Sequence, residues 1–297
     1  MNGIICINKP EGFTSFDVIA KLRGIMKIRR LGHGGTLDPM ATGVLPVYVG
    51  TATKACDIMP DSSKSYRASF ELGRVTDTQD ITGTVLSSSD MRVSRDSIEE
   101  LLPGFTGKIM QIPPMYSAVQ VNGQRLYDLA RKGVEVERQP REIEVKSLTL
   151  ADYDGESRRG VLEVSCGKGT YIRTLIHDIG EKLGCGGIMT ELERTSSGGF
   201  TLTDCYTLAE VQAAADENRL EELILPIERV FGSLPRLRLN EVQTRMYRNG
   251  VKLDLNRINR IKQDKLRYSV YGCDGCFIGI AAADTERSEL RAVKNFI

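Results

Sequence analysis

The chain has 297 residues, of which 27% are charged and 41% are hydrophobic, and its net charge at pH 7 is +1. This composition is typical of a globular protein, and the length suits one large domain with a smaller appendage. No stretch approaches the roughly 20 apolar residues that span a bilayer, and the opening lacks the basic and apolar run of a signal peptide. We therefore expect a cytoplasmic protein with no membrane partner.

The first part of the chain predicts alternating strands and a helix. Gly3–Asn8 is a short apolar run that predicts a strand. A helix follows, with Ser15 as its expected N-cap and apolar residues at helical spacing. After a glycine-rich loop, Val44–Val49 and Lys64–Leu72 predict two further strands.

The middle of the chain continues this mixture. Met115–Val121 predicts a strand that ends at the turn signal Asn122-Gly123, and Arg125–Arg131 predicts a short helix. Further strands are expected at Glu142–Leu150, Val161–Cys166 and Ile188–Arg194, and further helices at Thr170–Leu183 and Leu208–Leu225.

Domain organisation follows from this order of elements. Pro226 and the stretch Gly232–Pro235 indicate a boundary, and Leu237–Ile297 carries short strands and turns. We expect domains at residues 1–232 and 233–297. Strands and helices mix without regular alternation, so the fold class is α+β, with a mixed, largely antiparallel central sheet, flanking helices and a small β-rich C-terminal domain.

Charge and cysteine content give weaker signals. Five basic residues and no acidic one lie within residues 21–30, and ten basic residues lie within 236–267. Each run alone is more often a solvated face, but two of them favour a polyanionic partner.

The seven cysteines are scattered, and only Cys273 and Cys276 are close in sequence. We expect reduced, structural cysteines and no metal; a redox or metal role for this pair is the alternative.

Gly32–Leu45 is the densest candidate segment. It holds four glycines, a proline and a single carboxylate, Asp38, which describes a tight loop leading into a strand. The structural alternative is an ordinary Asp-Pro turn. No second acid lies nearby, so the paired carboxylates of a glycosidase are not indicated.

Two further segments carry candidate residues. Gly167–Arg173 lies where a strand meets a helix, and Lys168 and Arg173 would add charge to a helix N-terminus that attracts anions. The spacing of a P-loop is missing. Tyr66, at the start of a predicted strand, is placed to stack on a base, although such a residue is more often part of the core.

Taken together, these segments resemble the TruB family of tRNA pseudouridine synthases. Gly32–Leu45 matches the family pattern G-H-x-G-T-L-D-P-x-A-x-G-x-L in full. Similar family segments, in the same order, are Asn8–Ser15, Lys64–Tyr66, Asp77–Gly83, Pro113–Ala118, Gly123–Gly133 and Gly167–Arg173. The resemblance covers about residues 3 to 210. It departs at Gly186–Glu193, where the family commonly has a bulkier, more basic run, and resumes at Arg194–Gly198.

The resemblance implies a function and a site. It implies isomerisation of uridine 55 in the T loop of tRNA by the pseudouridine synthase fold, with Asp38 as the essential carboxylate, Arg173 as its partner and Tyr66 stacked on the uracil. Leu192 would pack at the base pocket, and His33 would fill the space that the flipped nucleotide leaves. Further substrate-binding residues implied are Lys9, Lys64, Asp80, Lys168 and Tyr171.

The resemblance also implies the partners. The T stem-loop of tRNA is the expected substrate, clamped by an insertion at about residues 122–142, and the C-terminal domain resembles a PUA-type RNA-binding domain. The reaction adds and removes no atoms, so no cofactor and no metal are expected, and we expect a monomer. Two rival interpretations are an RNA chaperone without chemistry and a guide-RNA-dependent synthase; the pattern Gly123–Gly133 favours the stand-alone bacterial form.

Overall fold

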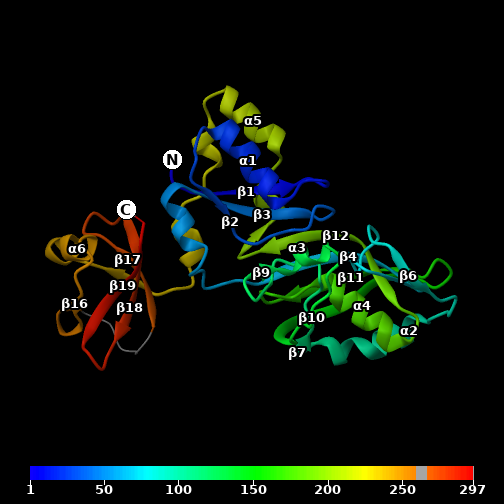
Figure 1. Ribbon diagram of the computed structural model, residues 1–297. Coiled ribbons are helices and arrows are strands. Elements are labelled where there is room, and N and C mark those ends of the chain that lie inside the picture. The colour runs from blue at the N-terminus through cyan, green and yellow to red at the C-terminus, as the bar shows by residue number, and fades with distance from the viewer. Residues whose placement is uncertain (259–265, 297) are drawn as a thin grey trace.

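A computed structural model describes residues 1–258 and 266–296. Its large sheet has the strand order β14-β1-β3-β12-β4-β11-β10-β7, with β2 on β3 and β13 on β12 (Figure 1). These strands are β1 (Gly3–Lys9), β2 (Leu31–His33), β3 (Thr42–Val49), β4 (Lys64–Leu72), β7 (Gly107–Gln111), β10 (Arg141–Asp154), β11 (Arg159–Cys166), β12 (Gly187–Ser197), β13 (Phe200–Thr201) and β14 (Cys205–Tyr206).

The pairing in this sheet is mostly antiparallel. Only β1 with β14 and β3 with β12 run parallel among the described pairs of this sheet. The predicted α+β fold with a largely antiparallel sheet is confirmed.

Helices cover the sheet in two groups (Figure 1). Helices α1 and α5 lie side by side and pack on β1 and β3 through an apolar cluster, while α2 and α4 pack on β4, β10, β11 and β12 through another. The helices are α1 (Ser15–Met26), α2 (Arg95–Leu101), α3 (Leu126–Ala130), α4 (Ile172–Leu183), α5 (Leu208–Asp216) and α6 (Glu241–Arg248). The 3₁₀ turns are η1 (Gly50–Ala55), η2 (Leu102–Phe105), η3 (Leu202–Asp204), η4 (Leu220–Leu223), η5 (Ile227–Phe231) and η6 (Leu255–Arg257).

The two halves of the sheet meet between β3 and β12. Pairing there is short, with Glu193 opposite Thr42 and Arg194 opposite Gly43. On its other side, β12 pairs with β4 along most of its length. We call this short junction between β3 and β12 the seam; the loop that joins β2 to β3 begins and ends beside it.

A smaller sheet forms the C-terminal unit. Its order is β15-β17-β18-β19-β16, built from β15 (Arg236–Arg238), β16 (Leu253–Asp254), β17 (Arg267–Tyr271), β18 (Phe277–Asp284) and β19 (Glu289–Asn295). It contacts η1, where Thr51 Oγ1 donates to the Phe296 carbonyl at 2.8 Å and Lys54 Nζ donates to the Asn295 carbonyl at 2.7 Å. Phe231, Ile280 and Phe296 share one apolar cluster with β1 and β3.

Two short hairpins project from the large sheet. One pairs β5 (Arg74–Thr76) with β6 (Val85–Ser88), and the other pairs β8 (Gln120–Val121) with β9 (Gln124–Arg125). The second hairpin turns at Asn122-Gly123, as the sequence predicts, and both turn residues have positive φ angles.

Three local predictions are wrong. Thr14, not Ser15, caps α1, because Ser15 Oγ accepts a hydrogen bond from the Leu37 amide instead. The strand expected at Met115–Val121 is a series of bends apart from β8. The helix expected over Leu208–Leu225 ends at Asp216, because Asn218 takes a left-handed conformation and only a 3₁₀ turn follows.

The basic run expected at residues 236–267 is only partly covered by the described residues. Three of its basic residues (Arg260, Lys262 and Lys265) and the acidic Asp264 lie outside the described residues, while Arg267 begins β17. The seven cysteines are free thiols. Within residues 1–258 and 266–296, no helix is long and apolar enough to cross a membrane.

Candidate active site

Asp38 lies in the loop between β2 and β3, beside the seam. The loop is held from both sides: the Leu37 amide donates to Ser15 Oγ at 2.8 Å, and the Gly12 amide donates to the Pro39 carbonyl at 2.9 Å. The side chain of Asp38 is 38% exposed. A half-exposed carboxylate on a fixed loop leaves one side open to a ligand.

Arg173, on the first turn of α4, holds the other side of that carboxylate. Its Nε atom lies 2.9 Å from Asp38 Oδ2, and its Nη1 atom lies 3.6 Å from Asp80 Oδ2. The two terminal nitrogens also donate to the carbonyl oxygens of Thr78 and Tyr116, both at 2.9 Å. Because the guanidinium is buried, these contacts fix its position and that of the Asp38 carboxylate.

Asp80 lies behind Arg173 and is itself buried. Its Oδ1 atom accepts hydrogen bonds from Thr78 Oγ1 at 2.7 Å, from the Thr82 amide at 3.0 Å and from Thr82 Oγ1 at 2.6 Å. The carboxylate is thus occupied by protein groups. Its geometry suits support of Arg173, and a direct contact with substrate remains a prediction.

Tyr66 and Leu192 lie on neighbouring strands and share the apolar cluster that also contains Leu37. Burial raises the pKa of Tyr66 to about 12, so the phenol is protonated at neutral pH. Arg194, its partner on the neighbouring strand, opposes this shift through its positive charge. The arrangement places an aromatic ring and an aliphatic side chain in the wall beside the Asp38 loop.

Lys9 is a fully buried cation that fixes the same loop. Its Nζ atom donates to the carbonyl oxygens of Phe13 at 2.6 Å, Pro10 at 2.9 Å and Pro39 at 3.2 Å. Burial lowers the pKa of Lys9 to about 8, against the opposing effect of Asp38. All three donors of the ammonium group have protein acceptors, so Lys9 is placed to shape the loop.

His33 and Lys64 flank the loop near its beginning. His33 Nδ1 accepts a hydrogen bond from the Gly35 amide at 3.4 Å, and burial, with Arg194 and Lys64 nearby, lowers the pKa of the imidazole. Burial, followed by the charge of Arg194, also lowers the pKa of Lys64. His33 is therefore a neutral imidazole at pH 7.

Lys168 and Tyr171 lie in the segment that leads into α4. Tyr171 precedes the helix, and its backbone amide and carbonyl bind the side chain of Gln111 at 2.9 and 3.1 Å. Lys168 is exposed and forms no ion pair with the described residues. The structure thus brings Asp38, Arg173 and Tyr66 together, and contacts of Lys168 and Tyr171 with substrate remain predictions.

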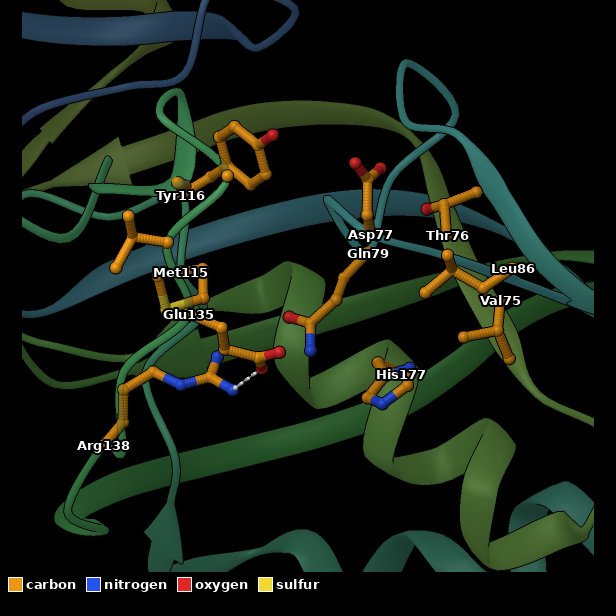
Figure 2. A pocket seen from close by; sticks show the side chains of 13 residues that line it. Val75, Thr76, Asp77, Gln79, Leu86, Met115, Tyr116, Glu135, Arg138 and His177 are labelled. Atoms are coloured by element: carbon orange, nitrogen blue, oxygen red, sulfur yellow. Dashed lines mark hydrogen bonds and ion pairs between the residues drawn. The ribbon is translucent and has the colours of Figure 1, made fainter. Parts of the chain in front are cut away.

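A separate hollow of about 450 Å³ lies between the β5–β6 hairpin, α4 and residues 115–138, and it is lined by Tyr116, whose carbonyl accepts a hydrogen bond from Arg173. Figure 2 shows the amide of Gln79 and the ring of His177 projecting toward it, below Tyr116 and Asp77. Thr174 Oγ1 donates to Gln79 Oε1 at 2.6 Å, and the buried His177 Nδ1 atom has no partner among the described residues. Sequence reasoning did not find this hollow, because its lining comes from five separate segments.

No group of three or more His, Cys, Asp or Glu side chains arranged for a metal ion occurs within the part of the chain that the structure describes. The candidate site is built around the Asp38 carboxylate with Arg173 and Tyr66, and the buried cations Lys9 and Arg194 support its loop.

Solved structures with this fold include complexes that contain Cbf5. The chain superposes on the structure titled "Crystal Structure of a Cbf5-Nop10-Gar1 Complex" with a TM-score of 0.76 and 26% identity, covering 99% of this chain and 85% of that one. An archaeal box H/ACA sRNP Nop10-Cbf5 complex gives a TM-score of 0.75 with 26% identity, covering 99% and 86%.

Sequence comparison gives the family. Residues 23–172 match the TruB family pseudouridylate synthase N-terminal domain, and residues 173–231 match the tRNA pseudouridylate synthase B C-terminal domain. The chain belongs to the TruB family of pseudouridylate synthases, and it is an isomerase. Curated relatives named tRNA pseudouridine synthase B are 43% identical in Dehalococcoides mccartyi (96% of this chain, 94% of the relative) and 43% identical in Clostridium perfringens (98% of each).

Proposed function

We propose that this tRNA pseudouridine synthase acts on uridine 55 in the T loop of tRNA, with Asp38 as the group that acts on the glycosidic bond. The observation that carries this proposal is the half-exposed Asp38 carboxylate, held on one side by Arg173 at 2.9 Å and free on the other. Tyr66 and Leu192 lie in the adjoining wall and supply the apolar contact that a flat base requires.

The chemistry is balanced without any other reactant. The bond between N1 of uracil and C1′ of ribose breaks, the base turns, and a bond between C5 and C1′ forms. The hydrogen at C5 leaves as a proton and N1 gains one. Asp38 would act either as a nucleophile or as a base toward the sugar, and both roles need its ionised form close to a positioned reactant.

Access to the glycosidic bond requires that the uridine leave the folded loop. Unstacking costs a few kcal/mol, which contacts to the flipped nucleotide and to phosphates must offset. His33, neutral and next to the Asp38 loop, would fill the vacated space. The basic residues along α1 would contact phosphates, and the exposed Phe16, with Arg23 over its ring at 5.8 Å, would offer a surface for stacking.

The hollow beside Arg173 would hold a second unpaired base next to the target. Val75, Leu86 and Val134 provide apolar walls, and Gln79 and His177 provide polar edges. A volume of about 450 Å³ accommodates a base with its sugar. Because Arg173 binds both Asp38 and the carbonyl of Tyr116 in the hollow wall, occupation of the hollow would support the geometry of the active site.

The wider organisation is part of the same proposal. Residues 1–232 would form the catalytic domain, with the segment 122–142 clamping the T stem-loop, and residues 233–297 would form a PUA-like RNA-binding domain. The enzyme would act as a cytoplasmic monomer. The 43% identity to tRNA pseudouridine synthase B over 98% of both chains favours a stand-alone enzyme over a guide-dependent one, whose structural relatives are 26% identical.

Tritium release from a T-arm stem-loop RNA, labelled at C5 of the target uridine, tests the proposal. The wild type should release tritium without any added cofactor or guide RNA, and Asp38→Asn should release none while its Kd for the RNA stays within about threefold. Asp96→Asn, on the surface of α2, is the matched control and should behave as wild type. Tight binding with no release from the wild type would exclude this substrate.

A further inference from the structure

Arg194, on β12 at the seam, is a fully buried cation. Its Nε atom donates to the Val44 carbonyl at 2.7 Å, Nη2 to the Gly35 carbonyl at 3.1 Å and Nη1 to the Thr36 carbonyl at 3.3 Å. It forms no ion pair with a carboxylate in residues 1–258 and 266–296. Burial of an uncompensated charge is costly, so the hydrogen bonds that it makes define its role.

These hydrogen bonds fix both ends of the loop that carries Asp38. Gly35 and Thr36 precede Asp38, and Val44 follows it on β3. Lys9 holds the Pro39 carbonyl from another side. The position of the Asp38 carboxylate therefore depends on a backbone that Arg194 holds at its entry and its exit.

The same side chain is also the cross-strand neighbour of Tyr66. Arg194 lies directly opposite Tyr66 in the β12–β4 pairing, so the two side chains are neighbours on one face of the sheet, and the positive charge of Arg194 lowers the pKa of the Tyr66 phenol against the effect of burial. One rigid side chain thus joins the loop of Asp38 to the aromatic residue in the wall of the site. A guanidinium can do this because its planar array of N–H donors serves acceptors in several directions, whereas a lysine ammonium is a single point.

We propose that Arg194 is a positioning residue of the isomerisation: it fixes the position of the Tyr66 side chain relative to the loop that carries Asp38. This inference rests on the proposed roles of Asp38 and Tyr66. Arg194 has no exposed surface and touches no substrate, so it acts only through these two neighbours. Its loss should slow the chemical step and leave the binding of RNA nearly unchanged.

A double-mutant cycle on the full chain tests this coupling. The single-turnover rate of tritium release and the Kd for the same stem-loop RNA are measured for the wild type, Arg194→Lys, Tyr66→Phe and the double variant. Arg194→Lys should lower the rate by about 10- to 100-fold with Kd within about threefold, since a displacement of about 1 Å in an active site can cost about 100-fold. In the Tyr66→Phe background, the same substitution should cost at most about threefold, because the shared contact is already lost.

The controls separate positioning from general destabilisation. Arg95→Lys makes the same change at an exposed arginine of α2 and should have no effect. If Arg194→Lys does not fold in thermal unfolding, Arg194→Gln takes its place in the cycle, since an amide keeps two donors and removes the buried charge.

Three results would overturn the inference. A folded Arg194 variant with the wild-type rate would exclude a positioning role, and so would a rate loss of equal size in the Tyr66→Phe background. A wild type that releases no tritium would overturn the proposed function together with this inference, whereas an active wild type with an unaffected Arg194→Lys variant would overturn the inference alone.

Discussion

The Nε atom of Arg173 lies 2.9 Å from Asp38 Oδ2, while the other two nitrogens of the same guanidinium donate to the backbone of residues 78 and 116. Arg173 therefore does more than balance the charge of Asp38. It joins the loop of Asp38, the segment around Thr78 and the segment around Tyr116 to helix α4. Any side chain that keeps only the charge will lose most of these connections.

Arg173→Lys should lower the single-turnover rate by about 100-fold or more, because an ammonium can neutralise Asp38 but cannot also reach both carbonyl oxygens. Two buried carbonyls would lose a donor, which should cost about 1–3 kcal/mol of unfolding free energy for each one left unpaired. Tritium release and urea unfolding measure the two effects. Arg159→Lys, at an exposed residue of β11, is the control, and equal rates for both variants would contradict the prediction.

The seam gives a prediction about stability. Gly43 has a φ angle of +101°, and a Cβ atom there would lie 2.3 Å from the Arg194 carbonyl oxygen and 2.8 Å from its amide nitrogen. Gly43→Ala should therefore lower the free energy of unfolding by roughly 3–5 kcal/mol, because neither backbone can move without breaking the β3–β12 pairing.

Gly169→Ala is the matched control for that change. Gly169 also has a positive φ angle, +87°, but a Cβ atom there would meet nothing within 4 Å. It should cost only the conformational penalty of about 1 kcal/mol. Equal losses for the two variants in chemical denaturation would show that contact at the seam adds nothing.

The candidate site was predictable from the sequence where its residues lie in short, unbroken motifs. Asp38, Tyr66 and Arg173 each belong to such a segment. The hollow was not predictable, because its lining residues come from segments that meet only in the folded chain. The bends at Met115–Val121 were missed for a similar reason: the Tyr116 carbonyl is used by Arg173, a contact that no local pattern reveals.

Buried charges were hidden by the strand pattern itself. Leu192 and Arg194 are two residues apart on β12, and both are buried. Alternation in a strand predicts an apolar residue at such a position. An arginine there breaks the apolar pattern, and the pattern does not show that its side chain is buried and hydrogen-bonded.

His177 provides a test of the hollow. His177→Phe keeps a ring of similar size but removes Nδ1, which is buried and has no partner among the described residues. If a second base occupies the hollow and bonds to the imidazole ring, the Kd of this variant for the stem-loop RNA should rise about tenfold. The stability of the free protein should stay the same or increase slightly, because an unpaired polar atom is removed.

The matched comparison uses RNAs that lack one base beside the target uridine, on either the 5′ or the 3′ side. One of these RNAs should bind wild type and His177→Phe equally well, since the base that His177 contacts is gone. A loss of affinity that is the same for intact and abasic RNAs would show that His177 does not contact a neighbouring base.

Lys9 gives a prediction about pH. Burial lowers the pKa of Lys9 from 10.5 to about 8, so between these two values the unfolded chain holds a proton that the folded protein has released. Since the unfolded state binds more protons there, the contribution of Lys9 to the free energy of unfolding should rise with pH across this window and stay constant below it.

Lys9→Met, which cannot titrate, is the reference. The difference in unfolding free energy, wild type minus Lys9→Met, should increase by roughly 2 kcal/mol between pH 7.5 and pH 10. Changes in other titrating groups cancel because both proteins carry them. A difference that stays constant over this range, measured by urea unfolding at each pH, would mean that Lys9 keeps its charge, and that its three carbonyl partners outweigh the cost of burying the ammonium.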